Sequence, residues 1–246
     1  MRPKFRNESF LLGCALLVLI NGTAFAVPAL QLDILGGAYD WSTETVVAQS
    51  DPFTLYAYLK PTLGAPLSDI YYISAALVPK TGPAPLTNGG SFVFNGTTVD
   101  VTQDMVYGIP PLETNLAASK DPGDLAKHGI FLTYFQEFSF TFNPASKATL
   151  YNTQDQPGIG PTANSSGSMY YMPFVVDTTG LAPGYAIHFD LYNEYARCSG
   201  DIDIDKFAPF SHDAQSGNPV PEPGTMVLLG TGLIGLAGWG RKRFHK

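Results

Sequence analysis

Short segments in which apolar and polar residues alternate recur through the middle of the chain, with prolines and glycines between them. Residues 53–59 place Phe, Leu or Ala at every second position and Thr or Tyr at the positions between. The same two-residue period occurs in 29–35, 138–142 and 187–192. Because successive side chains of a strand point to opposite faces, each segment predicts a half-buried β-strand.

Residues 92–101 predict a β-hairpin, because the runs 92–94 and 97–101 flank Asn-Gly, a pair that readily adopts the positive φ angles of a type I′ turn. Signals for helices are nearly absent. Residues 112–127 could form a turn or a short helix, which Pro122 and Gly123 would break. Many short strands joined by turns predict an all-β domain, built as an antiparallel two-sheet sandwich or jelly roll.

Two segments rich in Gly, Pro, Asn and Ser lie outside this pattern. We expect 152–168 to be an exposed loop within the domain and 216–220 to be a flexible linker after it. The β-domain is therefore predicted to span 27–215, and the linker would let it stand clear of whatever follows.

The first 26 residues have the three parts of a secretory signal peptide. Basic residues near the start precede the apolar run 10–20, and Ala24 and Ala26 supply the small side chains that a signal peptidase reads. Cleavage after Ala26 would leave Val27 as the new N-terminus. Lipoprotein processing at Cys14 is disfavoured, because only residues 10–13 of the apolar run precede it.

Residues 221–246 form a second targeting segment. Pro221, Glu222 and Pro223 precede an apolar, glycine-rich run over 225–240 and a basic tail over 241–246. At a rise of 1.5 Å per residue, a helix over the run would span about 24 Å, short for a bilayer core of about 30 Å. We expect a marginal transmembrane helix whose basic end stays in the cytoplasm.

This order of proline-flanked glutamate, short membrane helix and basic cluster resembles the PEP-CTERM sorting signal. The resemblance implies that an exosortase, a membrane enzyme similar to cysteine transpeptidases, recognises Pro221, Glu222 and Pro223 and cleaves near them. The helix would then anchor the protein only transiently. The alternative is an ordinary membrane anchor that is never processed.

The end of the domain resembles the choice-of-anchor group of exported bacterial proteins, and within it the N type. The residues that carry this resemblance are 181–185, 187–192 and 208–214. Such families combine a β-rich domain with a sorting tail, so the resemblance implies a location more than a chemistry.

Charge and cysteine usage agree with an exported protein. Residues 27–220 contain 19 acidic and 7 basic residues, a formal charge of −12. Nucleic acid is therefore excluded as a partner, because phosphate binding requires a basic patch. Cys198 is the one cysteine that remains after signal cleavage, so the mature chain cannot form an internal disulfide; this thiol is buried, free or paired with another molecule.

No catalytic motif appears in the domain. The chain lacks the local signatures of serine hydrolases, zinc proteases and nucleotide-binding enzymes. Ser211, His212 and Asp213 have the composition of a catalytic triad, but consecutive side chains on a strand point to opposite faces, so we expect a turn or capping role. A glycosidase leaves no local motif, and its carboxylates would come from Glu44, Glu113, Glu137 or Glu194.

Asp201, Asp203 and Asp205 alternate with isoleucines, so on a strand their carboxylates would share one face. The face is either solvated or holds Ca²⁺ together with another loop. An EF-hand is excluded, because Lys206 stands at the sixth position of the loop, where glycine is required, and His212 at the twelfth, where a glutamate is required.

The sequence thus predicts a non-enzymatic surface or extracellular-matrix protein. We expect export by way of the inner membrane, processing by signal peptidase and exosortase, and association with exopolysaccharide or biofilm, with no cofactor unless Ca²⁺ binds. The alternatives are a carbohydrate-binding module, for which tyrosines would supply stacking surfaces, and a secreted glycoside hydrolase.

Overall fold

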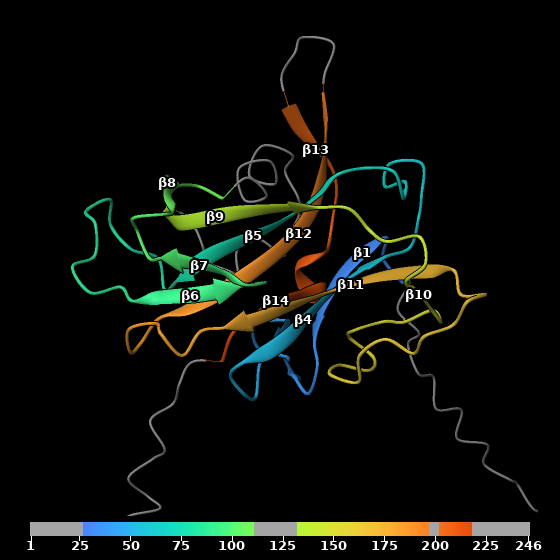
Figure 1. Cartoon of the computed structure of the whole chain (residues 1–246), viewed down its shortest axis with the longest axis horizontal. Helices are drawn as coiled ribbons and strands as arrows, with labels where there is room; N and C mark the ends of the chain where they lie inside the picture. The colour runs from blue at the N-terminus through green and yellow to red at the C-terminus, as the bar shows by residue number, and fades with distance from the viewer. Residues whose placement is uncertain (1–26, 111–131, 197–201, 218–246) are drawn as a thin grey trace, which may run out of the picture.

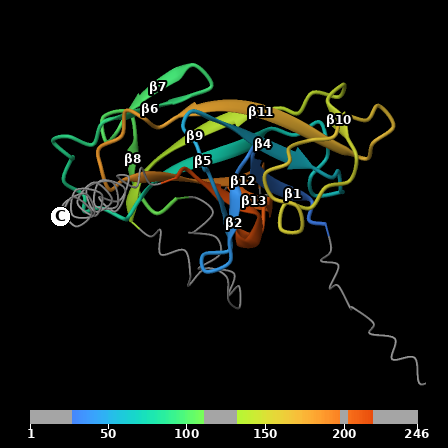
Figure 2. The same ribbon diagram turned by 90° about the horizontal axis from the view of Figure 1, so that it is seen from below.

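The computed structural model describes residues 27–110, 132–196 and 202–217, and this part of the chain folds into two stacked β-sheets (Figures 1 and 2). Within it, sheet 1 contains, in spatial order, β1 (Leu30–Ile34), β4 (Phe53–Leu59), β11 (Met169–Asp177), β6 (Ser91–Phe94) and β7 (Thr97–Asp100), with β10 (Lys147–Ala148) paired to β11.

Sheet 2 contains, over the same described residues, β2 (Ala38–Asp40), β3 (Thr45–Val47), β14 (Asp213–Gln215), β12 (Ala186–Ala196), β5 (Tyr71–Val78), β9 (Thr133–Phe140) and β8 (Val106–Gly108), with β13 (Ile202–Phe207) paired to β12. The described strands pair antiparallel except β3 and β14, which run parallel. A single turn of 3₁₀ helix, η1 (Phe210–His212), precedes β14. The predicted all-β fold with two sheets is confirmed.

The helices expected at the two ends, over 1–26 and 225–240, lie outside the described residues, as does the segment 112–127. Among the residues that are described, no helix has the length and apolar character needed to cross a membrane.

The predicted hairpin is confirmed at its turn. Asn95 and Gly96 have φ angles of 48° and 85°, and β6 and β7 pair on either side of them. Positive φ at both central residues matches the right-handed twist of the flanking strands, which is why an Asn-Gly pair specifies this connection.

Aromatic rings from both sheets meet in the core. Phe94 of sheet 1 stacks on Phe138 of sheet 2 with 4.1 Å between ring centroids. Phe189 of sheet 2 meets Phe53 of sheet 1 edge to face at 6.3 Å. These pairs lie on the alternating apolar positions of the strands, so burying that face of each strand holds the two sheets together.

The expectation of half-buried strands is wrong for β1 and for residues 186–193 of β12, which are buried on both faces. On β1 the polar face is covered by the segment after β10, because Gln31 donates to the carbonyl of Tyr151 (2.8 Å) and accepts from the backbone N–H of Thr153 (2.9 Å). The beginning of the predicted exposed loop 152–168 is therefore packed against sheet 1. On β12 the side chain of Tyr192 packs against Phe210 of η1.

The folded domain also extends beyond residue 215. Ser216 is fully buried. Its N–H donates to the carbonyl of Ile187 (2.8 Å), and its hydroxyl accepts from the Ile187 N–H (2.9 Å). Ser216 is thus part of the fold and not the first residue of a linker.

We predict that Phe189→Ala lowers the free energy of unfolding by about 3–5 kcal/mol, because the deleted ring leaves a cavity between the sheets. Equilibrium urea unfolding measures the loss. The matched control is Val175→Ala on β11, where the side chain is 57% exposed and the change should stay within about 0.5 kcal/mol. Equal losses at the two positions would contradict the assigned core.

Candidate functional site

A row of polar side chains crosses the outer face of sheet 2, the face turned away from sheet 1. We call it the polar row; its members are Thr45, Asp213, Asp190, Ser74 and Glu137. The register pairs Asp213 with Thr45, Asp190 with Ser74, and Ser74 with Glu137. Strand β14 lies beside β12 and pairs with it in a register that sets His188 opposite Gln215 and Phe189 opposite Ala214. This pairing joins the part of the row on β14 to the part on β12.

The row faces outward because the other face of β12 is used by the core. Phe189 and Leu191 belong to the main apolar cluster, so the alternation of a strand places His188 and Asp190 together on the opposite face. Both are nevertheless almost completely buried, as is Asp213. Buried charged side chains require partners, because their desolvation is otherwise costly.

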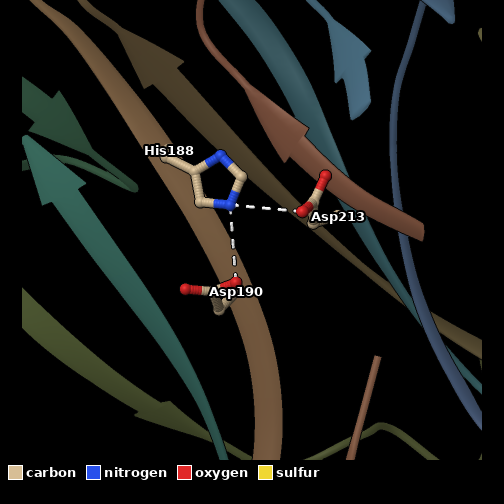
Figure 3. A group of neighbouring side chains, drawn as sticks. All are labelled: His188, Asp190 and Asp213. Carbon is tan, nitrogen blue, oxygen red and sulfur yellow. Dashed lines mark ion pairs between the residues drawn. The ribbon is translucent and has the colours of Figure 1, made fainter. Parts of the chain in front are cut away.

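His188 lies between two carboxylates (Figure 3). Its Nε2 atom is 3.4 Å from Asp190 Oδ1 and 3.3 Å from Asp213 Oδ2. Within the described residues these three side chains form a group whose donor atoms all lie within 4.8 Å of one another, which is the type of arrangement that can hold a metal ion. We call this group the His188 cluster.

In the His188 cluster, burial and the neighbouring charges have opposite effects on the pKa values of the side chains. Burial alone would lower the pKa of His188, but the adjacent carboxylates of Asp213 and Asp190 hold it well above the usual value. Burial raises the pKa of Asp213 to about 7, and the neighbouring His188 offsets part of this rise. The cluster can therefore share protons or bind a cation.

At the β9 end of the polar row, Glu137 accepts a hydrogen bond from the Tyr192 hydroxyl. Tyr72 stacks on Tyr192 with 5.7 Å between ring centroids. Burial, with a further contribution from Glu137, raises the pKa of Glu194. Two of the glutamates considered for a glycosidase thus lie near each other, while Glu113 lies outside the described residues.

A second buried carboxylate lies on the outer face of sheet 1. Asp33 accepts hydrogen bonds from the N–H of Gly158 (2.9 Å) and contacts the Tyr151 hydroxyl (2.6 Å). Gly158 has a φ of 80°, and a Cβ there would lie 2.3 Å from the carbonyl oxygen of Gly37, so only glycine fits. Burial raises the pKa of Asp33 to about 6, and the hydrogen bonds offset only part of this rise.

The Tyr151 hydroxyl also hydrogen-bonds to the carbonyl of Gln156. A phenol has one proton and cannot donate to two acceptors. If the Tyr151 hydroxyl donates to Gln156, it can only accept a hydrogen bond from Asp33. The Asp33 carboxyl group then has to carry a proton, which agrees with its raised pKa.

The sequence-predicted aspartates lie on or next to β13. Asp201 lies outside the described residues, and Asp203 pairs through its backbone with Tyr195. A register shift leaves Asp205 without a pairing partner in β12, which interrupts the alternation there. Asp205 lies 3.5 Å from Lys206 Nζ. Calcium binding by these residues stays a prediction.

The structure brings Ser211 and His212 together but turns Asp213 away from them. His212 contacts the Ser211 hydroxyl through Nδ1 (2.8 Å) and Asn152 Oδ1 through Nε2 (3.1 Å), while Asp213 faces His188. Burial lowers the pKa of His212 to about 4, so this ring is neutral. His212 joins η1 to the segment after β10, a structural role.

The sorting residues Pro221, Glu222 and Pro223 and the cleavage-site alanines Ala24 and Ala26 lie outside the described residues. Comparison with known protein families matches residues 219–242 to the PEP-CTERM protein-sorting motif. The chain therefore carries a PEP-CTERM sorting signal, which implies export, processing by an exosortase at the membrane and then delivery to the cell surface. A search of curated proteins found no match.

The His188 cluster was missed from the sequence. The pattern His-x-Asp at 188–190 was available, because on a strand it places both side chains on one face. Asp213 joins them only through the pairing of β14 with β12, a contact between distant segments that leaves no local pattern.

We predict that Asp33→Asn removes a pH dependence of stability. The pKa of Asp33 is higher in the folded state than in the unfolded chain, so its contribution to stability is greatest below about pH 4 and is lost as pH rises to about 6. Relative to wild type, Asp33→Asn should gain about 3 kcal/mol between pH 4 and pH 7. Urea unfolding across this range measures the difference.

Asp155→Asn, which changes an exposed carboxylate in the same loop, is the matched control and should follow wild type at every pH. If wild type instead gained stability over Asp33→Asn as pH rises, Asp33 would be ionised in the fold and its assignment would be wrong.

Proposed function

We propose that this protein is an exported, non-catalytic component of the cell surface or extracellular matrix that associates with exopolysaccharide and is released from its membrane tail by an exosortase. The observation that carries the proposal is the PEP-CTERM motif at 219–242. The described β-domain extends to residue 217, directly before the matched residues, as in a cargo domain followed by a sorting tail.

The chemistry of the domain supports a non-catalytic role. His188, Asp190 and Asp213 are buried, so they cannot touch a polymeric substrate on the outside. The acidic composition of residues 27–220 suits a protein that lies among hydrated polymers and is kept soluble by charge.

We predict that replacing Pro221, Glu222 and Pro223 with alanine leaves export intact but blocks release. The signal peptide is unchanged, so the domain still crosses the membrane, while the tail is no longer recognised. A membrane-bound form that retains the basic C-terminus should accumulate. Fractionation and intact-mass analysis measure this; the wild-type surface form should begin at Val27 and lack residues 225–246.

The control is Asn218→Ala, which lies next to the matched segment but outside it and should be released like wild type. Wild-type chains that end at Lys246 on the cell exterior would overturn the sorting proposal.

A carbohydrate-binding module is the second candidate, favoured by two tyrosines on the outer face of sheet 1. Tyr56 of β4 and Tyr171 of β11 are only partly buried, and their ring centroids are 6.2 Å apart. Flat aromatic surfaces with polar ends suit stacking against sugar rings.

If this candidate is correct, the protein binds the exopolysaccharide of its own cell, and Tyr171→Ala weakens that binding several-fold. Trp41→Ala, an exposed aromatic next to β2 in sheet 2, serves as the control. A glycan array and pull-down with purified exopolysaccharide test it, and equal binding by both variants would exclude the tyrosine surface.

A further inference from the structure

The His188 cluster joins two strands that are far apart in sequence. His188 and Asp190 lie on β12, and Asp213 lies on β14. All three are at most 2% exposed, and their donor atoms converge on one point between the strands (Figure 3).

The distances in the cluster suit metal ligands better than direct hydrogen bonds. Nε2 of His188 is 3.4 Å and 3.3 Å from the two carboxylate oxygens, whereas charge-assisted N–H···O bonds measure about 2.7–2.9 Å. Ligands bound at about 2.0–2.2 Å to a tetrahedral ion are separated from each other by about 3.3–3.6 Å. Both separations from Nε2 fall in that range, and all three donor atoms lie within 4.8 Å of one another.

Asp190 and Ser74 provide a second, independent observation. Neither oxygen of the Asp190 carboxylate forms a hydrogen bond with any described residue, and the same holds for the hydroxyl of Ser74. Both side chains are buried, and the register places Ser74 directly across from Asp190 on the same face. Buried polar atoms normally have partners, so these point to a bound group at the cluster.

The charge of the cluster indicates the kind of group. When a metal ion takes the place of the His188 ring proton, the neutral imidazole and the two carboxylates together carry two negative charges, which a divalent cation balances inside the protein. One nitrogen and two oxygen donors suit Zn²⁺ and related transition ions, whereas Ca²⁺ takes six to eight oxygens and does not favour imidazole.

We infer that His188 Nε2, one oxygen of Asp190 and one oxygen of Asp213 bind a divalent transition-metal ion of the Zn²⁺ type, which ties β14 to β12. The ion has a structural role, because burial of its ligands leaves no open path for a substrate. The mature part of this exported chain cannot form an internal disulfide. The ion supplies the cross-link that a disulfide would otherwise supply.

The test uses the processed protein, which begins at Val27, purified from the surface of producing cells without chelators. Elemental analysis should find one equivalent of a transition metal per chain. Removal with dipicolinate should lower Tm by about 5–10 °C, and added Zn²⁺, but not Ca²⁺, should restore it. Less than a tenth of an equivalent of metal, together with a Tm that added Zn²⁺ does not change, would overturn the inference.

Asp190→Asn should weaken metal binding at least about tenfold, since it removes a ligand. Asp33→Asn, which replaces a buried carboxylate of sheet 1, is the matched control and should keep its metal. If Asp190→Asn also keeps the metal, the site lies elsewhere.

X-ray absorption on the wild-type protein gives a readout that does not depend on the variants folding. Nitrogen and oxygen neighbours at about 2.0–2.1 Å support the cluster, whereas sulfur at about 2.3 Å would assign the ion to Cys198 and refute the inference.

Discussion

Strand β12 is buried on both faces, and this constraint determines much of the surrounding structure. One face supplies Phe189 and Leu191 to the core, so alternation forces His188 and Asp190 onto the other face, where they are also removed from water. A buried histidine and a buried carboxylate are tolerated only if neighbours compensate them. The neighbour is Asp213 of β14, so the position of the last described strand and the polar face of β12 depend on each other.

Sheet 1 meets the same constraint by a different means. Asp33 is buried on the outer face of β1, but its neighbours are a tyrosine hydroxyl and a backbone N–H. These groups carry no positive charge, so burial keeps the carboxyl group protonated to a higher pH. In the His188 cluster the imidazole offsets part of the rise that burial causes in the pKa of Asp213. The surroundings of a buried acid thus differ between the two sheets: hydroxyl and amide groups lie beside Asp33, whereas an imidazole lies beside Asp190 and Asp213.

The class of fold, the hairpin and some of the strands, such as β1, β4 and β12, could be predicted because they depend on local alternation and on Asn-Gly at the turn. The double burial of β1 and β12 could not be predicted, because it depends on which segments later cover the outer faces. Gln31 is covered by Tyr151 and Thr153, about 120 residues further along the chain. The same holds for the His188 cluster, since His188 and Asp190 are neighbours on one strand while Asp213 arrives through β14. The sorting signal was predictable because it is one continuous stretch of sequence, residues 219–242.

The order of strands in sheet 2 links the domain to the tail that follows it. Among the described strands, β2 and β3 are joined to the rest of the sheet through β14, which lies between β3 and β12. Residues 38–47 therefore cannot join sheet 2 until residues 213–215 are available, and contacts over such a separation form late because loop closure is costly in entropy. The strand that links β2 and β3 to the rest of sheet 2 therefore lies in the sequence just before the segment matched to the sorting motif, residues 219–242.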